Sequence, residues 1–188
     1  YVERVRANVK RQALYCDMLG SARWAGELAQ RYPAREITPL TPWFANISIH
    51  DVEITGCSTL VDVSALPEKP VKNFFFGNVK AHCDRIGKIC DATKFSMKDV
   101  RIESCDTVMR IDNCDYASFF GFSNVTTGSS VKIEKTGGEC RYLNVQTYPL
   151  VPVNYQSIRP GEVWLDTEGK PIQAHGFQVT FREGKYYW

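Results

Sequence analysis

The sequence predicts an all-β protein whose main part is a right-handed parallel β-helix, and three observations lead to this fold class. First, a loose repeat runs through residues 44–145, with a period of roughly 21 to 27 residues. Second, each repeat alternates apolar and polar residues, which is the pattern of a strand. Third, this stretch has no Asn-Gly or Asp-Gly turn of the kind that joins paired antiparallel strands. A strand that returns at such a period is typical of a solenoid, and a β-sandwich is the alternative fold.

Three units show the repeat most clearly, at residues 44–52, 71–79 and 92–100. Each has an apolar residue, two polar or small residues, and then apolar residues at alternate positions ending in valine. A coil of a solenoid buries its apolar side against its neighbours, and successive coils are roughly 4.8 Å apart. We therefore expect six apolar side chains to stack in one core: Val61, Val63, Phe74, Phe76, Phe95 and Met97.

The chain before the main repeat predicts one coil and an interruption. Strands are expected near residues 2–9 and 13–18, where apolar and polar residues alternate. Residues 21–32 have apolar residues at helical spacing instead, which predicts a short helix or an irregular loop that leaves the solenoid. The repeating coils then run from Trp43 to about Gln146.

The last forty residues predict a second, incomplete domain. We expect residues 1–148 to form the β-helix, 149–160 a proline-rich linker and 161–188 the start of another module. A hairpin is predicted there around Arg182-Glu183-Gly184-Lys185. Both ends of the sequence look cut, so we expect the chain to be a segment of a larger protein.

Composition excludes two classes of function. The net charge is only +2, which gives no basic surface for nucleic acid. No apolar run approaches the length of a membrane span. Hydrophobic residues make up 44% of the chain and charged residues 23%, as in an ordinary globular protein. We therefore expect no nucleic-acid partner, no membrane span and no cofactor.

The seven cysteines leave two interpretations open. None is in a Cys-x-x-Cys motif, so we expect no zinc site. The favoured interpretation is that the cysteines are small buried residues stacked inside the coils. The other is a disulfide between Cys83 and Cys90, which an exported protein could form.

The residues that could carry chemistry are few. Hydrolysis of a sugar polymer needs two carboxyl groups, and Asp112 with Asp115 is a candidate pair, but both are favoured as turn residues between coils. Asp17 ends a coil strand, where a role in a cleft and a role as a turn cap are both open. His50 and His82 are expected at the surface or at coil ends, and without a metal.

Aromatic residues gather around the interruption of the coils. Tyr15, Trp24, Tyr32 and Trp43 lie in or beside residues 20–43. Such rings either stack on sugars or pack the loop against the solenoid, and the sequence leaves both interpretations open.

Residues 1–110 resemble the C-terminal coils of family 28 glycoside hydrolases, the polygalacturonase family. The stretches that carry the resemblance are Val2-Glu3-Arg4-Val5, Ala13-Leu14-Tyr15-Cys16-Asp17-Met18, Pro42-Trp43-Phe44-Ala45-Asn46-Ile47 and, most specifically, Leu66-Pro67-Glu68-Lys69-Pro70-Val71-Lys72-Asn73. The resemblance implies a parallel β-helix that acts on pectic polymers by inversion. The family's catalytic aspartates, its Gly-His-Gly turn and its Arg-x-Lys clamp lie on earlier coils and do not occur here. We therefore identify no catalytic residue in this segment.

Residues 160–176 and 184–188 resemble the opening of some family 43 glycoside hydrolases, which are β-propellers. The resemblance implies that a propeller-like module begins here, with His175 near its central pocket. The family pattern has a run of glycines after the histidine, and Phe177 and Gln178 replace them in this sequence.

Together these features predict a segment of an exported, periplasmic or extracellular, pectin-degrading glycoside hydrolase whose catalytic residues lie upstream. The alternative is a non-catalytic β-helix module that binds polysaccharide or braces a neighbouring domain. The expected partners are a pectic or galactan-type polysaccharide and neighbouring domains of the same chain. The candidate substrate-binding residues are Tyr15, Asp17 and His175.

Overall fold

The computed structural model describes residues 1–146, residue 172 and residues 180–187. The chain divides into two units, Tyr1–Leu150 and Val151–Trp188, and each is described by itself. The predicted linker at 149–160 and His175 lie outside the described residues.

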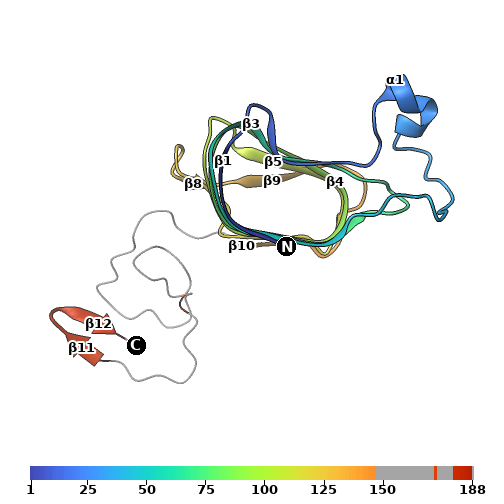
Figure 1. Ribbon diagram of the computed structural model, residues 1–188. Helices are drawn as coiled ribbons and strands as arrows, with labels where there is room; N and C mark the ends of the chain where they lie inside the picture. Colours follow the sequence, from blue (N-terminus) through green and yellow to red (C-terminus); the bar gives the residue numbers. More distant parts are fainter. Residues whose placement is uncertain (147–171, 173–179, 188) are drawn as a thin grey trace. The chain divides into compact units, whose positions relative to one another are not determined.

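The first unit is a parallel β-helix of about four turns, so the predicted fold class is confirmed and the β-sandwich is excluded. Figure 1 looks along the coils, whose strands superimpose on one outline. The neighbouring long strands pair in parallel throughout. The strands of this unit are β1 (Val2–Asn8), β2 (Gln12–Asp17), β3 (Ala45–Ser64), β4 (Val71–Glu103), β5 (Val108–Asp115), β6 (Ser118–Phe120), β7 (Ser123–Asn124), β8 (Ser129–Ser130), β9 (Lys132–Gly137) and β10 (Asn144–Gln146).

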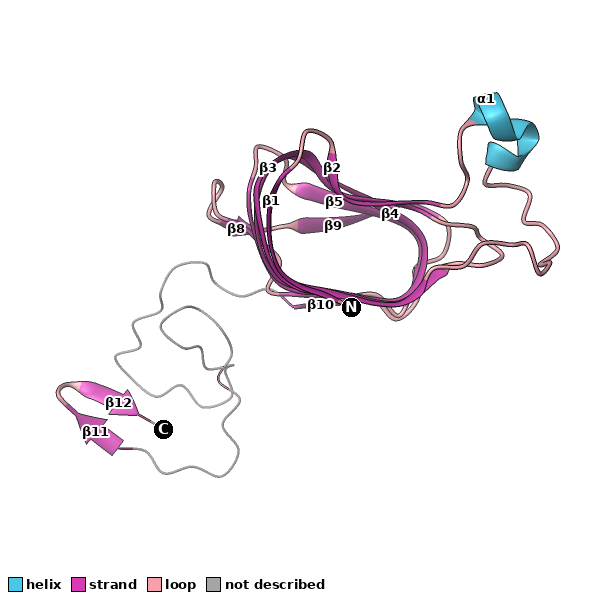
Figure 2. Cartoon of the chain, in the orientation of Figure 1, coloured by secondary structure: helices cyan, strands magenta, loops and turns pink. Residues whose placement is uncertain are grey.

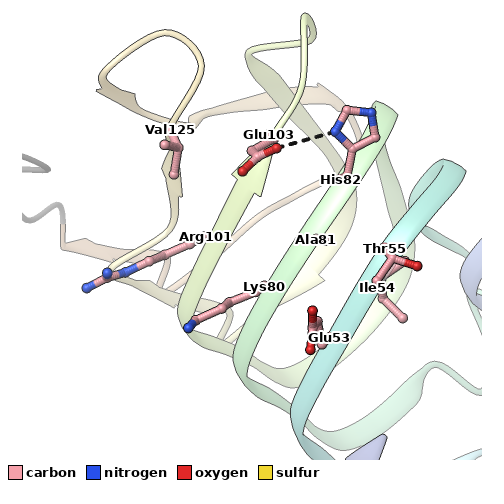
Figure 3. A pocket seen from close by; sticks show the side chains of 9 residues that line it. All are labelled: Glu53, Ile54, Thr55, Lys80, Ala81, His82, Arg101, Glu103 and Val125. Atoms are coloured by element: carbon pink, nitrogen blue, oxygen red, sulfur yellow. Dashed lines mark ion pairs between the residues drawn. The ribbon is translucent and has the colours of Figure 1, made fainter. Parts of the chain in front are cut away.

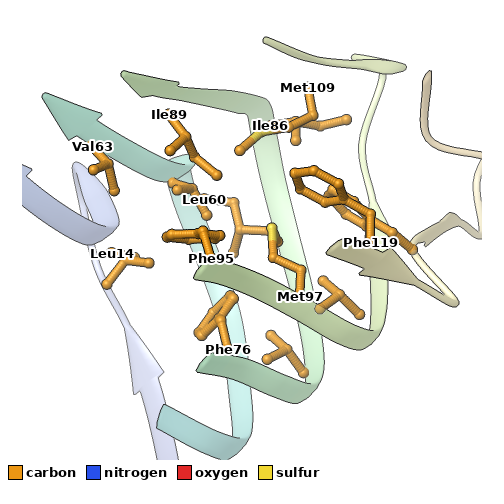
Figure 4. Close-up of a cluster of buried hydrophobic side chains, with 14 of the residues drawn as sticks. Leu14, Leu60, Val63, Phe76, Ile86, Ile89, Phe95, Met97, Met109 and Phe119 are labelled. Carbon is orange, nitrogen blue, oxygen red and sulfur yellow. The ribbon is translucent and has the colours of Figure 1, made fainter. Parts of the chain in front are cut away.

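The core lies inside the coils, as the repeat predicts. All six expected side chains are buried, with exposed fractions of 0 to 3%. Phe74 and Phe95 stack on successive coils with ring centroids 4.9 Å apart and nearly parallel planes. Figure 4 shows Phe76, Phe95 and Met97 pointing from two successive turns of β4 into the same interior. Stacking of like residues lets each coil cover the apolar face of the next.

The coils turn at residues with left-handed backbone conformation, which gather at three corners. Their φ angles lie between 47° and 59°, a region where Asn, Asp and Gly are favoured among residue types. Amide side chains link the coils there: Asn73 donates to Asn46 at 2.8 Å, and Asn113 donates to Asp91 at 2.6 Å. The three groups are Arg4, Asp51, Asn78 and Asp99; Asn46, Asn73, Lys94, Tyr116 and Tyr142; and Asp91, Asn113 and Gly138.

The predicted interruption is confirmed as an excursion from the coils between β2 and β3. It contains the short helix α1 (Ala22–Ala25) and the 3-10 helix η1 (Gly26–Ala29), and it extends away from the coil outline in Figures 1 and 2. Ser21 caps α1 by accepting a hydrogen bond from the Arg23 backbone. Arg35 donates to the carbonyls of Glu27, Leu28 and Gln30, which satisfies the C-terminal groups of η1.

Three of the seven cysteines follow the interior interpretation, and Cys105 is exposed. None of the seven is in a disulfide, and Cys57, Cys83 and Cys114 are buried. The disulfide considered between Cys83 and Cys90 is wrong. Both residues belong to the continuous strand β4, so no loop between them brings their sulfur atoms together.

In the second unit, the predicted hairpin is confirmed as the antiparallel pair β11 (Thr180–Arg182) and β12 (Lys185–Tyr187). Glu183 and Gly184 form its turn, and both have positive φ, at 52° and 76°. Two successive positive φ angles match the twist of a two-residue hairpin turn.

Candidate functional site

Tyr15 and Asp17, two of the predicted substrate-binding residues, interact with each other at the end of β2. The Tyr15 hydroxyl donates to Asp17 Oδ2 at 2.9 Å. Asp17 Oδ1 accepts from the backbone N–H groups of Leu19 and Gly20, at 2.9 and 3.3 Å. This carboxylate therefore caps the turn through which the chain leaves the coil, and the cap interpretation explains its position.

A different arginine binds each of the carboxyl groups of Asp112 and Asp115, the candidate pair. Asp112 accepts from Arg31, and Asp115 accepts from Arg141 at 2.6 Å. The Arg141 guanidinium lowers the pKa of Asp115. Both aspartates were predicted as turn residues between coils, and each lies beside a corner of the coil, at Asn113 and Tyr116, but within the continuous strand β5. Strand pairing continues through the corner that Asn113 makes with a φ of 51°.

Arg31 is the residue that fastens the excursion to the coils. Its guanidinium donates to Asp91 Oδ1 at 2.9 Å and to Asp112 Oδ2 at 2.9 Å, and it makes a further contact with Asp91 through Nε. The two carboxylates raise the pKa of Arg31. The side chain of Asp91 is fully buried, so this ion pair neutralises a charge inside the protein. The cluster is an anchor, since its carboxylates are occupied.

The outer side of β1, β3 and β4 carries charged side chains in two rows. Along a strand, alternate residues face the same side. In the first row, Arg6 pairs in register with Glu53, and Glu53 pairs with Lys80. Figure 3 shows Glu53 on β3 and Lys80 and Arg101 on two successive turns of β4, all pointing outward, with a second row behind them. We call this set the charged face: Arg6, Glu53, Lys80, His82, Arg101 and Glu103.

Two adjoining hollows cross the charged face. The larger has a volume of about 580 Å³ and the smaller about 360 Å³. They share Glu53 and Lys80, so they form one shallow groove that runs over successive coils. The residues that line the larger hollow are Glu53, Ile54, Thr55, Lys80, Ala81, His82, Arg101, Glu103 and Val125.

The charges in the groove are open to solvent. Arg6 and Glu53 form an ion pair with a distance of 3.4 Å between Nε and Oε2, and their side chains are 74% and 50% exposed. His82 and Glu103 form another at 3.5 Å, drawn dashed in Figure 3. Exposed pairs of this kind contribute about 0 to 1 kcal/mol. A ligand that brings its own carboxylates can therefore replace them at little cost.

The groove is suited to binding more than to hydrolysis. Lys80 is exposed and has no ion-pair partner among the described residues, and its neighbour Arg101 adds a second cation. General acid catalysis by a carboxyl group depends on burial or on a nearby anion that keeps the proton on it. Glu53 and Glu103 are half exposed or more and lie among cations instead. This arrangement can hold an anionic, hydroxyl-rich chain.

Comparison with protein-family models, with curated proteins and with solved structures gives no match for this chain. The resemblance to families 28 and 43 therefore stays a prediction that depends on the residues quoted for it. The two helices among the described residues are single turns, and neither is long and apolar enough to cross a membrane.

The sequence contains a pattern that predicts the charged face, although none of the three predicted substrate-binding residues belongs to it. Asn46, Asn73 and Lys94 occupy equivalent places in the repeat. Counting seven positions onward from each of them reaches Glu53, Lys80 and Arg101. Extending the repeat from its apolar residues to its polar ones would have placed these three in one row. Nothing comparable points to Arg31, which reaches Asp91 from 60 residues away in the sequence.

Proposed function

We propose that this chain is a segment of an exported, pectin-degrading glycoside hydrolase of the polygalacturonase type. Its charged face binds the anionic polymer, and residues outside this segment hydrolyse it. Lys80 and Arg101 pair with the carboxylates of successive sugars, while Glu53 and Glu103 accept hydrogen bonds from sugar hydroxyls. Tyr15 and His175 are not needed for this contact.

One observation supports the binding role above all others, namely the groove that follows Glu53, Lys80 and Arg101 over successive coils. Coils stack at about 4.8 Å, so side chains from adjacent coils meet an extended polymer at regular intervals. A polymer with a carboxylate on every sugar gains from such a row, whereas a compact ligand would use only one or two of the side chains. The resemblance of residues 1–110 to polygalacturonases favours the same substrate class.

The second candidate function is a non-catalytic polysaccharide-binding module. The observation behind it is that arginines occupy the carboxyl groups of Asp112 and Asp115, so the described residues themselves support binding and not hydrolysis. The two candidates share the binding step and differ in hydrolysis by the whole protein. Release of reducing sugar from polygalacturonate by the full-length protein supports the hydrolase, and binding without release supports the module.

The test of the binding role is calorimetric titration of this chain with oligogalacturonate, with its methyl ester and with a neutral galactan oligosaccharide. We expect the free acid to bind at least tenfold more tightly than the ester. Its affinity should also fall with added salt, because exposed charges are screened over about 10 Å at 0.1 M ionic strength. Equal affinity for acid and ester, or no binding of either, contradicts the proposal.

A further inference from the structure

A cluster of metal-ligating groups lies at the corner of the coils beside the charged face. Glu3, His50 and Asp51 bring one ligand atom each to within 4.8 Å of one another. Glu3 and His50 are register partners on β1 and β3, so the strand pairing itself sets their side chains next to each other. Asp51 follows at the corner, with a φ of 56°. The histidines had no expected ligand partner in the sequence, because Glu3 comes from a different coil.

Neighbouring side chains orient both carboxylates of this cluster. Arg4 Nη2 donates to Glu3 Oε1 at 2.6 Å, and Asn78 Nδ2 donates to Asp51 Oδ1. In each carboxylate the other oxygen, Glu3 Oε2 or Asp51 Oδ2, is directed at the His50 ring. The site is thus supported by residues from successive coils. Support of this kind is what fixes ligands around a metal ion.

The two nitrogens of His50 have different partners, which separates a ligand from a residue that orients it. Nδ1 lies 2.7 Å from Asp51 Oδ2, and this hydrogen bond holds the plane of the ring. Nε2 lies 4.0 Å from Glu3 Oε2 and 2.6 Å from the Tyr1 hydroxyl. A histidine that binds a metal through one nitrogen commonly donates from the other to a carboxylate. Asp51 and His50 have that arrangement.

We propose that His50 Nε2 and Glu3 Oε2 bind a divalent transition-metal ion of the zinc class, with Asp51 as the residue that orients the ring. Zinc bonds to imidazole nitrogen and carboxylate oxygen are about 2.0–2.2 Å long. The observed 4.0 Å between Nε2 and Oε2 therefore needs only a small closure around the ion. The Tyr1 hydroxyl hydrogen-bonds to both of these atoms, at 2.6 Å from Nε2 and 3.0 Å from Oε2, so this exposed side chain moves aside when the ion binds, and water completes the coordination. This inference does not depend on the proposed function.

The charge balance of the cluster favours a cation. Glu3 and Asp51 bring two negative charges, and Arg4 offsets one of them. The His50 side chain keeps 21% of its surface exposed, so an ion can reach it from solvent. Mixed imidazole and carboxylate ligands suit zinc better than calcium or magnesium, which prefer oxygen alone.

The test is equilibrium dialysis of the whole chain against zinc chloride near neutral pH, followed by calorimetric titration. We expect the wild type to bind one zinc ion. His50→Gln should lower the affinity at least tenfold, and Glu3→Gln should do the same as an independent check. Asp51→Asn should lower it by about ten- to a hundredfold, the usual effect of losing the residue that orients a ligand. The matched control is His82→Gln, an exposed histidine that is also paired with a carboxylate, and it should bind zinc as the wild type does.

Cobalt(II) distinguishes this site from the seven cysteines. An ion held by nitrogen and oxygen gives no intense sulfur-to-cobalt charge-transfer absorption, whereas an ion on a thiolate does. Such a band in the wild type would place the ion on cysteine and overturn the proposal. Stoichiometric binding that His50→Gln leaves unchanged, or no binding by the wild type, would overturn it too.

Discussion

The inward and outward side chains of the same strands differ in burial and in how much they contribute to stability. Along β4, Ile86 and Phe95 point inward and are 0% and 1% exposed, while Lys80 and His82 point outward into solvent. The inward side chains touch equivalent residues of the next coil, so each coil depends on its neighbours. The outward ones meet across exposed ion pairs that add little to stability. The interior therefore specifies the fold, and the outer face can specialise in binding without changing it.

The largest effect is expected from truncation of an inward ring. Phe95→Ala removes a ring that is 1% exposed and stacked on Phe74. The free energy of unfolding should fall by roughly 3 to 5 kcal/mol, as for other buried Phe→Ala changes. The matched outward change on the same strand is Lys98→Ala, which should stay within about 0.5 kcal/mol of the wild type. Denaturant unfolding followed by circular dichroism measures both. Equal losses for the two variants would show that inside and outside do not differ as described.

A smaller effect is expected where the excursion meets the coils. Arg31→Leu leaves the carboxylate of Asp91 buried without its cation. Breaking a buried ion pair on one side costs about 3 kcal/mol at the low end of the usual range. The low end applies because the Arg31 side chain keeps 19% of its surface exposed. In Arg35→Leu only hydrogen bonds to exposed backbone carbonyls are lost, and water can replace them, so the total loss should be below about 1.5 kcal/mol. An unchanged unfolding midpoint for Arg31→Leu would mean that the anchor is dispensable.

The smallest expected effect is a difference in labelling rate between a buried and an exposed cysteine, which tests the contrast between inside and outside without any mutation. Burial raises the pKa of the Cys114 thiol to about 12, so almost none of it is thiolate at pH 8. Cys105 is exposed and should react first with iodoacetamide under native conditions. Mass spectrometry of the labelled peptides gives the order, and Cys114 labelled as fast as Cys105 would contradict the buried interior.

The two sides also differ in how far the sequence predicts them. Phe74, Phe76 and Met97 could be assigned to the core, because an alternating apolar pattern that repeats from coil to coil has one simple solution. The corners were harder to predict from the sequence, because Lys94 and Tyr116 adopt a left-handed conformation that their residue types do not favour. They do so because the residues above and below them in the column already turn there.

The candidate site was harder to predict than the core. Tyr15 and Asp17 were predicted to bind substrate, but their contacts are with each other and with the local turn. The charged face depends on register between coils, and an insertion in one coil would shift it. The pairing of Glu3 with His50 and of Arg31 with Asp91 joins residues far apart in sequence, and no repeat links the two members of either pair.

The central claim is that the outward row on β3 and β4 binds an anionic polysaccharide while the inward residues carry the fold. The most direct measurement is the affinity for oligogalacturonate of Lys80→Gln and of Arg101→Gln, with Lys98→Gln as the control outside the groove. We predict a loss of affinity of at least fivefold for each groove variant, no loss for the control, and unfolding midpoints equal to the wild type for the exposed Lys80→Gln and Lys98→Gln. Unchanged affinity in both groove variants, or an equal loss in Lys98→Gln, would contradict the account.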